Sequence, residues 1–403
     1  MERRTFDKYE ILIGDSRETL SELDSKSVQC VVTSPPYFGL RNYGNDKQIG
    51  LEETVEDYVS SLVEVFSEIW RVLRDDGIVW LNLGDSYAGG GGANGIPADW
   101  ESISTTNLDK YPKHNDPKKD YKKLGFKKKD LIGVPWRVAF ALQDWGWYLR
   151  QDIIWHKPNP MPESVTDRCT KSHEYLFLLS KSPRYFYDAE AVRENKGAPP
   201  DVRKRSSTFA KQGNVGDHHK GAEELSIIGR NRRSVWTIAT QPYSGAHFAT
   251  FPPKLIEPCI LAGTSEKGQC PHCGSPWRRN VDRRQSFESG SGKSGNPISG
   301  KNGDKLQGGG NTGDIRKGPI SITTTTGWEP TCNCPEHDPV PQTVLDPFGG
   351  SGTTAGVSIK HGRKSILCEL NSDYVNMIRD RINHITNNEL DRDDFIDKLF
   401  VKE

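Results

Sequence analysis

The sequence predicts an α/β fold in which helices cover both faces of a doubly wound, mostly parallel sheet. Two strand–helix–strand units predict it, one between residues 27 and 83 and one between residues 343 and 370. Such units build parallel sheets, because parallel neighbours need a long crossover connection that is usually a helix. The 403 residues suffice for one large domain with insertions or for two domains, and the hydrophobic content of 34% predicts sizeable polar loops.

Two strands come first along the chain. The apolar run 11–13 forms a short strand that ends in the turn at Gly14 and Asp15, and residues 27–33 form a second strand. Pro35 and Pro36 cannot continue a hydrogen-bonded ladder, so the chain leaves the sheet there.

A long helix follows, with apolar residues at helical spacing from Val55 to Leu73. Asp75-Asp76-Gly77 ends this helix, and residues 78–83 form the next strand. In the middle of the chain the patterns predict a helix at 135–145, strands at 147–155 and 173–179, and a helix that starts after Pro252-Pro253 and reaches 261. Irregular, polar or flexible segments are predicted at 89–130, 197–229 and 286–317.

The second unit ends in a candidate ligand site. Its elements are a buried strand at 343–346, a glycine-rich turn at 347–352, a helix at 353–361, a strand at 365–370 and an amphipathic helix at 373–385. Glycines let the backbone approach a ligand closely, and the start of the next helix presents free N–H groups to an anionic group. Glu369 lies where doubly wound folds place an acceptor for a ribose hydroxyl. No lysine follows the glycines, so this turn is not a GxxxxGK[ST] phosphate loop.

A second candidate site, Thr33-Ser34-Pro35-Pro36-Tyr37, follows the strand at 27–33. An exocyclic amine of a nucleic-acid base is a poor nucleophile, because its lone pair is delocalised into the ring. The Ser34 side chain and the rigid Pro35 carbonyl are two acceptors that would hold such a nitrogen closer to tetrahedral. Tyr37 would stack on a base swung out of the duplex.

The charges are unevenly spread, although the net charge is zero. Residues 113–129 hold eight lysines and two acids, and residues 193–233 hold ten basic residues and five acids. One such run alone would be a solvated loop, but two of them favour a phosphate-facing surface. No apolar run is long enough to cross a bilayer and the first residues do not resemble a signal peptide, so a soluble, cytoplasmic protein is expected.

The eight cysteines do not resemble a disulfide framework. Two close pairs, Cys270 with Cys273 and Cys332 with Cys334, supply four thiolates, enough to close a structural zinc site. The first pair, followed by a glycine, has the form of a ribbon knuckle, and the second is one residue tighter than usual. These spacings favour zinc over free thiols, with the ion bracing an insert and not taking part in catalysis.

Together the two candidate sites resemble the amino-methyltransferase family of bacterial and archaeal DNA modification enzymes. Thr33-Ser34-Pro35-Pro36-Tyr37 matches the family's (D/N/S)PP(Y/F) catalytic motif, and Phe348-Gly349-Gly350-Ser351-Gly352 matches its FxGxG cofactor motif. The catalytic motif comes first, as in the permuted β group of the family. The segment from Phe251 to Leu255 resembles the one that packs on the methionine part of the cofactor, and the turn at Gly14-Asp15 resembles one found ahead of the catalytic motif.

The resemblance implies a Rossmann-like class I methyltransferase fold, S-adenosylmethionine as the cofactor and double-stranded DNA as the substrate. It assigns catalysis to Ser34, Pro35, Pro36 and Tyr37. It assigns cofactor binding to Asp15, Phe251, Asp346, Phe348, Gly349, Gly350, Gly352, Thr353 and Glu369. It divides the chain into a catalytic half (1–85), a target-recognition region whose strands complete the sheet (86–245), a cofactor-packing segment (246–261), a cysteine-containing insert (262–340) and a cofactor-binding half (341–403).

The first motif position bears on the target base. Family members with serine there mostly methylate cytosine N4 and those with aspartate mostly adenine N6, so Ser34 favours cytosine N4. Adenine N6 methylation stays an alternative, as do methylation of RNA or protein amides and a zinc-dependent DNA-binding protein with a degenerate enzyme domain. A cognate restriction endonuclease encoded nearby would be a partner.

Three further features of the sequence are assigned no catalytic role. Pro258-Cys259 resembles the nucleophilic pair of cytosine C5 methyltransferases, but its position on a helix favours a small buried residue. Most of the tryptophans are expected in the core. A proline-rich stretch before His173-Glu174 holds residues that could contact DNA or the catalytic pocket but receive no role: Arg150, His156, Lys157, Asn159 and Arg168.

Overall fold

The computed structural model describes residues 2–39, 48–88, 124–195, 227–241, 243, 250–286 and 320–387. The chain divides into two compact units. Unit 1 comprises residues 1–192, 233–278 and 329–403, and unit 2 comprises residues 193–232 and 279–328. Each unit has its own sheet, and the candidate sites described below all belong to unit 1.

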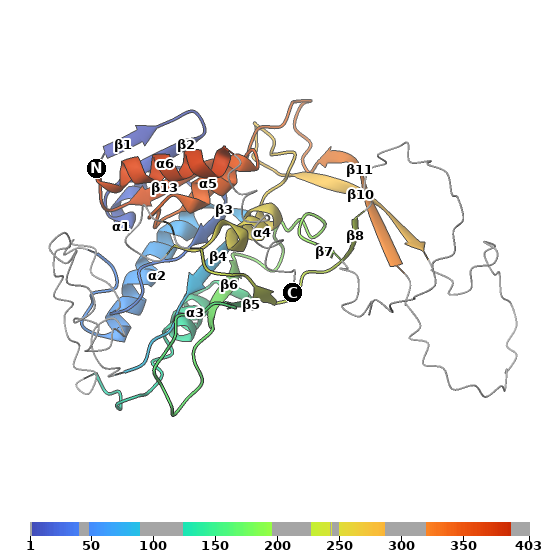
Figure 1. Ribbon diagram of the computed structural model, residues 1–403. Helices are drawn as coiled ribbons and strands as arrows, with labels where there is room; N and C mark the ends of the chain where they lie inside the picture. The colour runs from blue at the N-terminus through green and yellow to red at the C-terminus, as the bar shows by residue number, and fades with distance from the viewer. Residues whose placement is uncertain are drawn as a thin grey trace, which may run out of the picture. The chain divides into compact units, whose positions relative to one another are not determined.

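Unit 1 is built on a nine-stranded sheet (Figure 1). Across the sheet the strands are β1 (Glu2–Thr5), β2 (Tyr9–Ile13), β13 (Lys364–Glu369), β12 (Thr343–Asp346), β3 (Val28–Thr33), β4 (Leu73–Leu83), β6 (His173–Ser180), β5 (Tyr148–His156) and β9 (Val235–Thr237). The consecutive pairs from β2 to β4 are parallel, as are β5 and β9. The pairs β1–β2, β4–β6 and β6–β5 are antiparallel, so the sheet is mixed, with its parallel strands at the centre.

Helices cover both faces of this sheet, as the sequence predicts (Figure 1). One face carries α1 (Ser16–Thr19), the short 3-10 helix η1 (Leu20–Glu22), α2 (Val55–Val72) and α3 (Val134–Trp145). The other carries α4 (Pro253–Gly263), α5 (Thr353–Lys360) and α6 (Tyr374–Thr386). Cys259 lies on α4, fully buried next to Cys30 of β3, which is the small-residue packing role expected for it. Trp147, Trp155 and Trp236 are buried in the core, whereas Trp145 is exposed.

The strand predicted at 78–83 begins earlier than expected, directly after α2. Leu73 already pairs with Val28, and Asp75-Asp76-Gly77, which was predicted to end the helix, lies inside β4. Gly77 lets β4 lie close to β3, because a Cβ atom there would lie only 2.7 Å from the backbone oxygen of Gln29. The spacing of Leu73 fits both the helix and the strand. Because Leu73 pairs with β3, it belongs to the strand.

Unit 2 contains a four-stranded sheet in the order β10 (Trp277–Ser286), β11 (Ile320–Pro330), β8 (Ile227–Arg230) and β7 (Glu194–Asn195). The sequence patterns predicted none of these strands, because their charged and threonine-rich runs show little alternation of apolar and polar residues. Residues 89–123, 196–226 and 287–319, which hold most of the predicted irregular segments and basic stretches, lie outside the described residues. No helix in the described part of the chain is both long and apolar enough to cross a membrane.

Candidate active site

The ends of the parallel strands bring the two predicted turns together at one edge of the sheet. Asp15 follows β2, Glu369 ends β13, Asp346 ends β12 and Ser34 follows β3. Because β12 lies directly beside β3, the two turns are neighbours in space although more than 300 residues separate them. This edge is where doubly wound folds bind their ligands.

A buried hydrogen-bond network at Asp346 ties the turns to each other. Thr33 Oγ1 donates to Asp346 Oδ1 at 2.7 Å, and Thr354 Oγ1 donates to Asp346 Oδ2 at 2.7 Å. The backbone N–H of Phe348 donates to Oδ1 at 3.1 Å. Asp346 is 1% exposed, and burial raises the pKa of its carboxyl to about 7. The side chain predicted to bind the cofactor thus holds the glycine-rich turn against β3.

Glu369 closes the glycine-rich turn from the neighbouring strand. Its carboxylate accepts hydrogen bonds from Gly350 N at 2.8 Å and from Asn371 N at 3.0 Å. Burial raises the pKa of Glu369 to about 7, against the opposing effect of these two N–H donors. Gly350 has a φ of +51° and Gly352 a φ of +80°, a backbone conformation that glycine adopts at little cost.

The other predicted cofactor residues lie around the same turn. Gly349 packs so closely on β13 that a Cβ atom would lie 3.2 Å from Cys368 O. Thr353 is the first residue of α5 and is buried, and Phe348 packs partly buried against the core. Asp15 caps α1 by accepting from Arg17 N at 2.9 Å. Phe251 precedes α4 and packs against the apolar cluster on that face.

The predicted catalytic turn, residues 33–37, is held from two sides. Tyr58 of α2 donates its hydroxyl hydrogen to Pro36 O at 2.9 Å, and Pro35 is buried. A Cβ atom on Gly84, at the end of β4, would lie 2.6 Å from Tyr37 Cε2, so the glycine leaves room for the ring. Within the described residues, no hydrogen bond to the Pro35 carbonyl is found.

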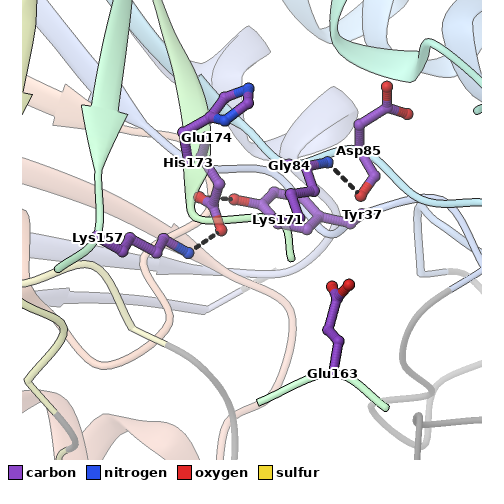
Figure 2. A pocket seen from close by; sticks show the side chains of 8 residues that line it. All are labelled: Tyr37, Gly84, Asp85, Lys157, Glu163, Lys171, His173 and Glu174. Carbon is purple, nitrogen blue, oxygen red and sulfur yellow. Dashed lines mark hydrogen bonds and ion pairs between the residues drawn. The ribbon is translucent and has the colours of Figure 1, made fainter. Parts of the chain in front are cut away.

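A chain of hydrogen bonds runs from Ser34 to Lys157. Ser34 Oγ donates to Tyr37 Oη at 3.3 Å, and Tyr37 Oη donates to Glu174 Oε2 at 2.8 Å. Lys157 Nζ in turn forms an ion pair with the Glu174 carboxylate. Figure 2 shows Glu174 between Lys157 and Tyr37. Burial, together with the nearby Glu174 charge, raises the pKa of Tyr37 well above its usual value, so the hydroxyl keeps its proton.

A pocket of ≈ 150 Å³ opens beside this chain of hydrogen bonds. It is lined by Tyr37, Gly84, Asp85, Lys157, Glu163, Lys171, His173 and Glu174 (Figure 2). Lys171 Nζ donates to Asp85 O at 2.7 Å, and burial lowers the pKa of Lys171. The Asp85 carboxylate accepts from Gly133 N and Val134 N, both at 3.0 Å, so Asp85 caps α3 as well as lining the pocket.

Sequence reasoning did not place Lys157, Lys171, His173 and Glu174 at this pocket. Lys157 directly follows β5 and His173 begins β6, and these strands are antiparallel, so both ends meet at the edge where β3 and β4 also end. The one available signal was a set of charged residues at strand ends. That pattern does not predict the strand order β4–β6–β5, which brings these residues close to Tyr37.

The four clustered cysteines form a separate candidate metal centre. The Sγ atoms of Cys270, Cys273, Cys332 and Cys334 all lie within 4.8 Å of one another. Arg74 Nη1, at the opposite end of β4 from Gly84, donates to Cys273 O at 3.0 Å, so this cluster lies away from the pocket.

The chain is similar to several known proteins. A family model described as DNA methylase matches residues 28–275 and 337–380. The type II methyltransferase M.SmaI of Serratia marcescens is 37% identical over 372 residues, which cover 92% of this chain and 90% of that protein. The type II methyltransferase M.Cfr9I of Citrobacter freundii is 49% identical over 251 residues, or 62% of this chain and 71% of that protein. Among solved structures, the cytosine-N4-specific PvuII DNA methyltransferase shares the fold, with a TM-score of 0.50 at 18% identity over 96% of this chain and 95% of that one.

Proposed function

The chain belongs to the N4/N6 family of DNA methylases, and from this premise we propose that it methylates cytosine N4 at a specific site in duplex DNA. The observation that carries this proposal is the meeting of the serine-containing catalytic turn and the glycine-rich turn on adjacent strands. Ser34 at the first motif position favours cytosine N4 over adenine N6. The cytosine-N4 specificity in the name of the PvuII enzyme agrees with this choice.

The glycine-rich turn fits S-adenosylmethionine, the cofactor of this family. When bound, S-adenosylmethionine supplies an electrophilic methyl group on a sulfonium centre. Glu369, which is 8% exposed, is a carboxylate acceptor suited to the ribose hydroxyls. The start of α5 offers N–H donors for a carboxylate, and Phe251 offers an apolar surface.

The hydrogen-bond chain gives Ser34 the role that the reaction needs. Glu174, which pairs with Lys157, accepts the hydrogen of the Tyr37 hydroxyl, so the Tyr37 oxygen accepts a hydrogen bond from Ser34. Ser34 therefore presents its lone pairs, and not its hydrogen, to a target amine. With the Pro35 carbonyl it would accept the two amine hydrogens and orient the nitrogen lone pair towards the methyl group. As the N–C bond forms, the S–C bond would break to leave a neutral thioether, and the nitrogen would lose one proton to solvent.

The raised pKa of Glu369 predicts a pH-dependent affinity for the cofactor. The carboxyl is protonated below about pH 7 and ionised above it, and the ionised form is the stronger acceptor for ribose hydroxyls. Affinity for S-adenosylmethionine, measured by calorimetry, should therefore rise between about pH 6 and pH 8. Glu369→Gln should flatten this rise, since the cofactor's own ionisation is common to both proteins. Equal slopes for the two proteins would contradict the role of Glu369.

Nucleoside analysis tests the target base. Duplex DNA incubated with the full-length chain and S-adenosylmethionine is digested, and its nucleosides are separated and weighed. N4-methylcytosine is the expected product, and the Tyr37→Ala protein is the negative control. N6-methyladenine would overturn the cytosine assignment. Methyl transfer to RNA or protein but not to duplex DNA would overturn the substrate.

The type II relatives suggest a biological setting. We propose that the chain protects its host's DNA from a cognate restriction endonuclease, with the basic residues between β4 and β9 contacting DNA phosphates. Plasmid DNA from cells that express the chain should become resistant to one endonuclease specificity. Plasmids from cells with the Tyr37→Ala protein should stay sensitive.

A further inference from the structure

Four cysteine sulfurs converge on one point of unit 1. They come from two segments, Cys270–Cys273 and Cys332–Cys334, that 58 residues separate, and each Sγ lies within 4.8 Å of the others. A tetrahedral zinc site with Zn–S bonds of about 2.3 Å places its sulfurs about 3.8 Å apart. The four sulfurs therefore need to move by less than about 1 Å to bind a single ion.

The first segment already has the shape of a metal-binding turn. Gly274 has a φ of +71°, and its N–H donates to Cys270 O at 2.9 Å. His272 N donates to Cys270 Sγ at 3.4 Å. Such N–H···S contacts stabilise a thiolate and so favour metal binding.

The surroundings tie both segments to the central sheet. Arg74, near the start of β4, donates to Cys273 O at 3.0 Å and pairs with Asp76. Thr331 Oγ1 donates to Pro276 O at 2.7 Å, which joins the second segment to the first. The chain of unit 2 from Arg279 to Trp328 leaves and returns between these two segments.

We infer that Cys270, Cys273, Cys332 and Cys334 bind one structural zinc ion that closes the base of the 58-residue segment between them. The ion fixes both ends of this segment to the start of β4. A metal that binds only the folded form adds its binding free energy to stability. β4 has 11 residues, so at about 3.3 Å per residue the zinc site lies roughly 30 Å from the end that holds Gly84. The ion is therefore structural and takes no part in methyl transfer.

Metal content of the full-length protein tests the inference directly. Protein purified without chelator should contain zinc at one ion per chain by plasma mass spectrometry. Cys273→Ser and Cys332→Ser should each lose the ion. Cys169→Ser is the matched control, because Cys169 is exposed and lies outside the cluster, and it should keep the full zinc content.

Cobalt substitution reports the ligand set without relying on the variants' folding. Wild-type protein stripped of zinc by a mercurial and reloaded with cobalt should show the absorption of a tetrahedral four-thiolate site, with thiolate-to-cobalt charge transfer. Zinc loss should lower the melting temperature by several degrees, and reloading should restore it. Wild-type protein without zinc, a cobalt spectrum lacking thiolate charge transfer, or disulfides among these four cysteines in unreduced peptide maps would each overturn the inference.

Discussion

Replacing Tyr37 by alanine is expected to lower the turnover number on DNA by at least about 100-fold while changing cofactor affinity less than about threefold. Stacking of a base on an aromatic ring contributes about 1–3 kcal/mol, and 1.36 kcal/mol corresponds to a tenfold change in rate. The substitution also breaks the path from Ser34 to Glu174, which frees the Ser34 hydroxyl to rotate. Single-turnover methyl transfer and calorimetric cofactor binding measure the two effects separately.

Tyr37→Phe separates stacking from hydrogen bonding. It keeps the ring beside Gly84 and removes only the hydroxyl, so a loss of about tenfold is expected if the orientation of Ser34 matters. Turnover equal to that of the wild type would show that the hydrogen-bond chain has no catalytic role. Unchanged turnover in Tyr37→Ala would reject the stacking role as well.

Replacing Asp346 by alanine is expected to destabilise the fold more than any other single change at the site. Thr33, Thr354 and the N–H of Phe348 would each lose a buried acceptor, at a cost of about 1–3 kcal/mol per group. The free energy of unfolding should fall by roughly 3–5 kcal/mol, and cofactor affinity should fall by more than about tenfold because the turn is no longer held against β3. Denaturant titration and calorimetry measure these two quantities.

Two variants make this prediction specific. Asp346→Asn keeps the shape and one acceptor, and it resembles the protonated carboxyl that the raised pKa of Asp346, about 7, already favours, so it should cost less than Asp346→Ala. Thr33→Val removes a single hydrogen bond at nearly constant volume and should cost about 1–2 kcal/mol. Equal stability of Asp346→Ala and the wild type would show that the buried hydrogen bonds to Asp346 do not stabilise the fold.

The parts of the fold that could be predicted are those whose pattern is local. Val55 to Leu73 repeats at helical spacing, and the strand–turn–helix around Gly350 follows from glycine and apolar runs, so the elements on both sides of the sheet were expected. The order of the strands, with β12 beside β3, was not predicted, because it follows from no spacing in the chain.

The parts that escaped prediction depend on which strands become neighbours. Glu174 reaches Tyr37 because β6 lies antiparallel to β4, and Lys157 reaches Glu174 because β5 lies antiparallel to β6. β1 is a polar edge strand, and β10 is rich in arginine, so neither has the apolar alternation that marks a half-buried strand. Likewise, nothing in the sequence showed that Asp346 would bind Thr33 across two strands.

The position of β12 and β13 between β2 and β3 has a consequence for biosynthesis. A ribosome releases the first two of these four strands some 300 residues before the other two, so β2 and β3 emerge without the neighbours that later separate them. Until then their unpaired edges are open to wrong partners, which is the usual hazard of strands that wait for distant ones. A nascent chain halted before residue 343 should therefore need chaperones, and it should be far more prone to aggregate than the finished protein.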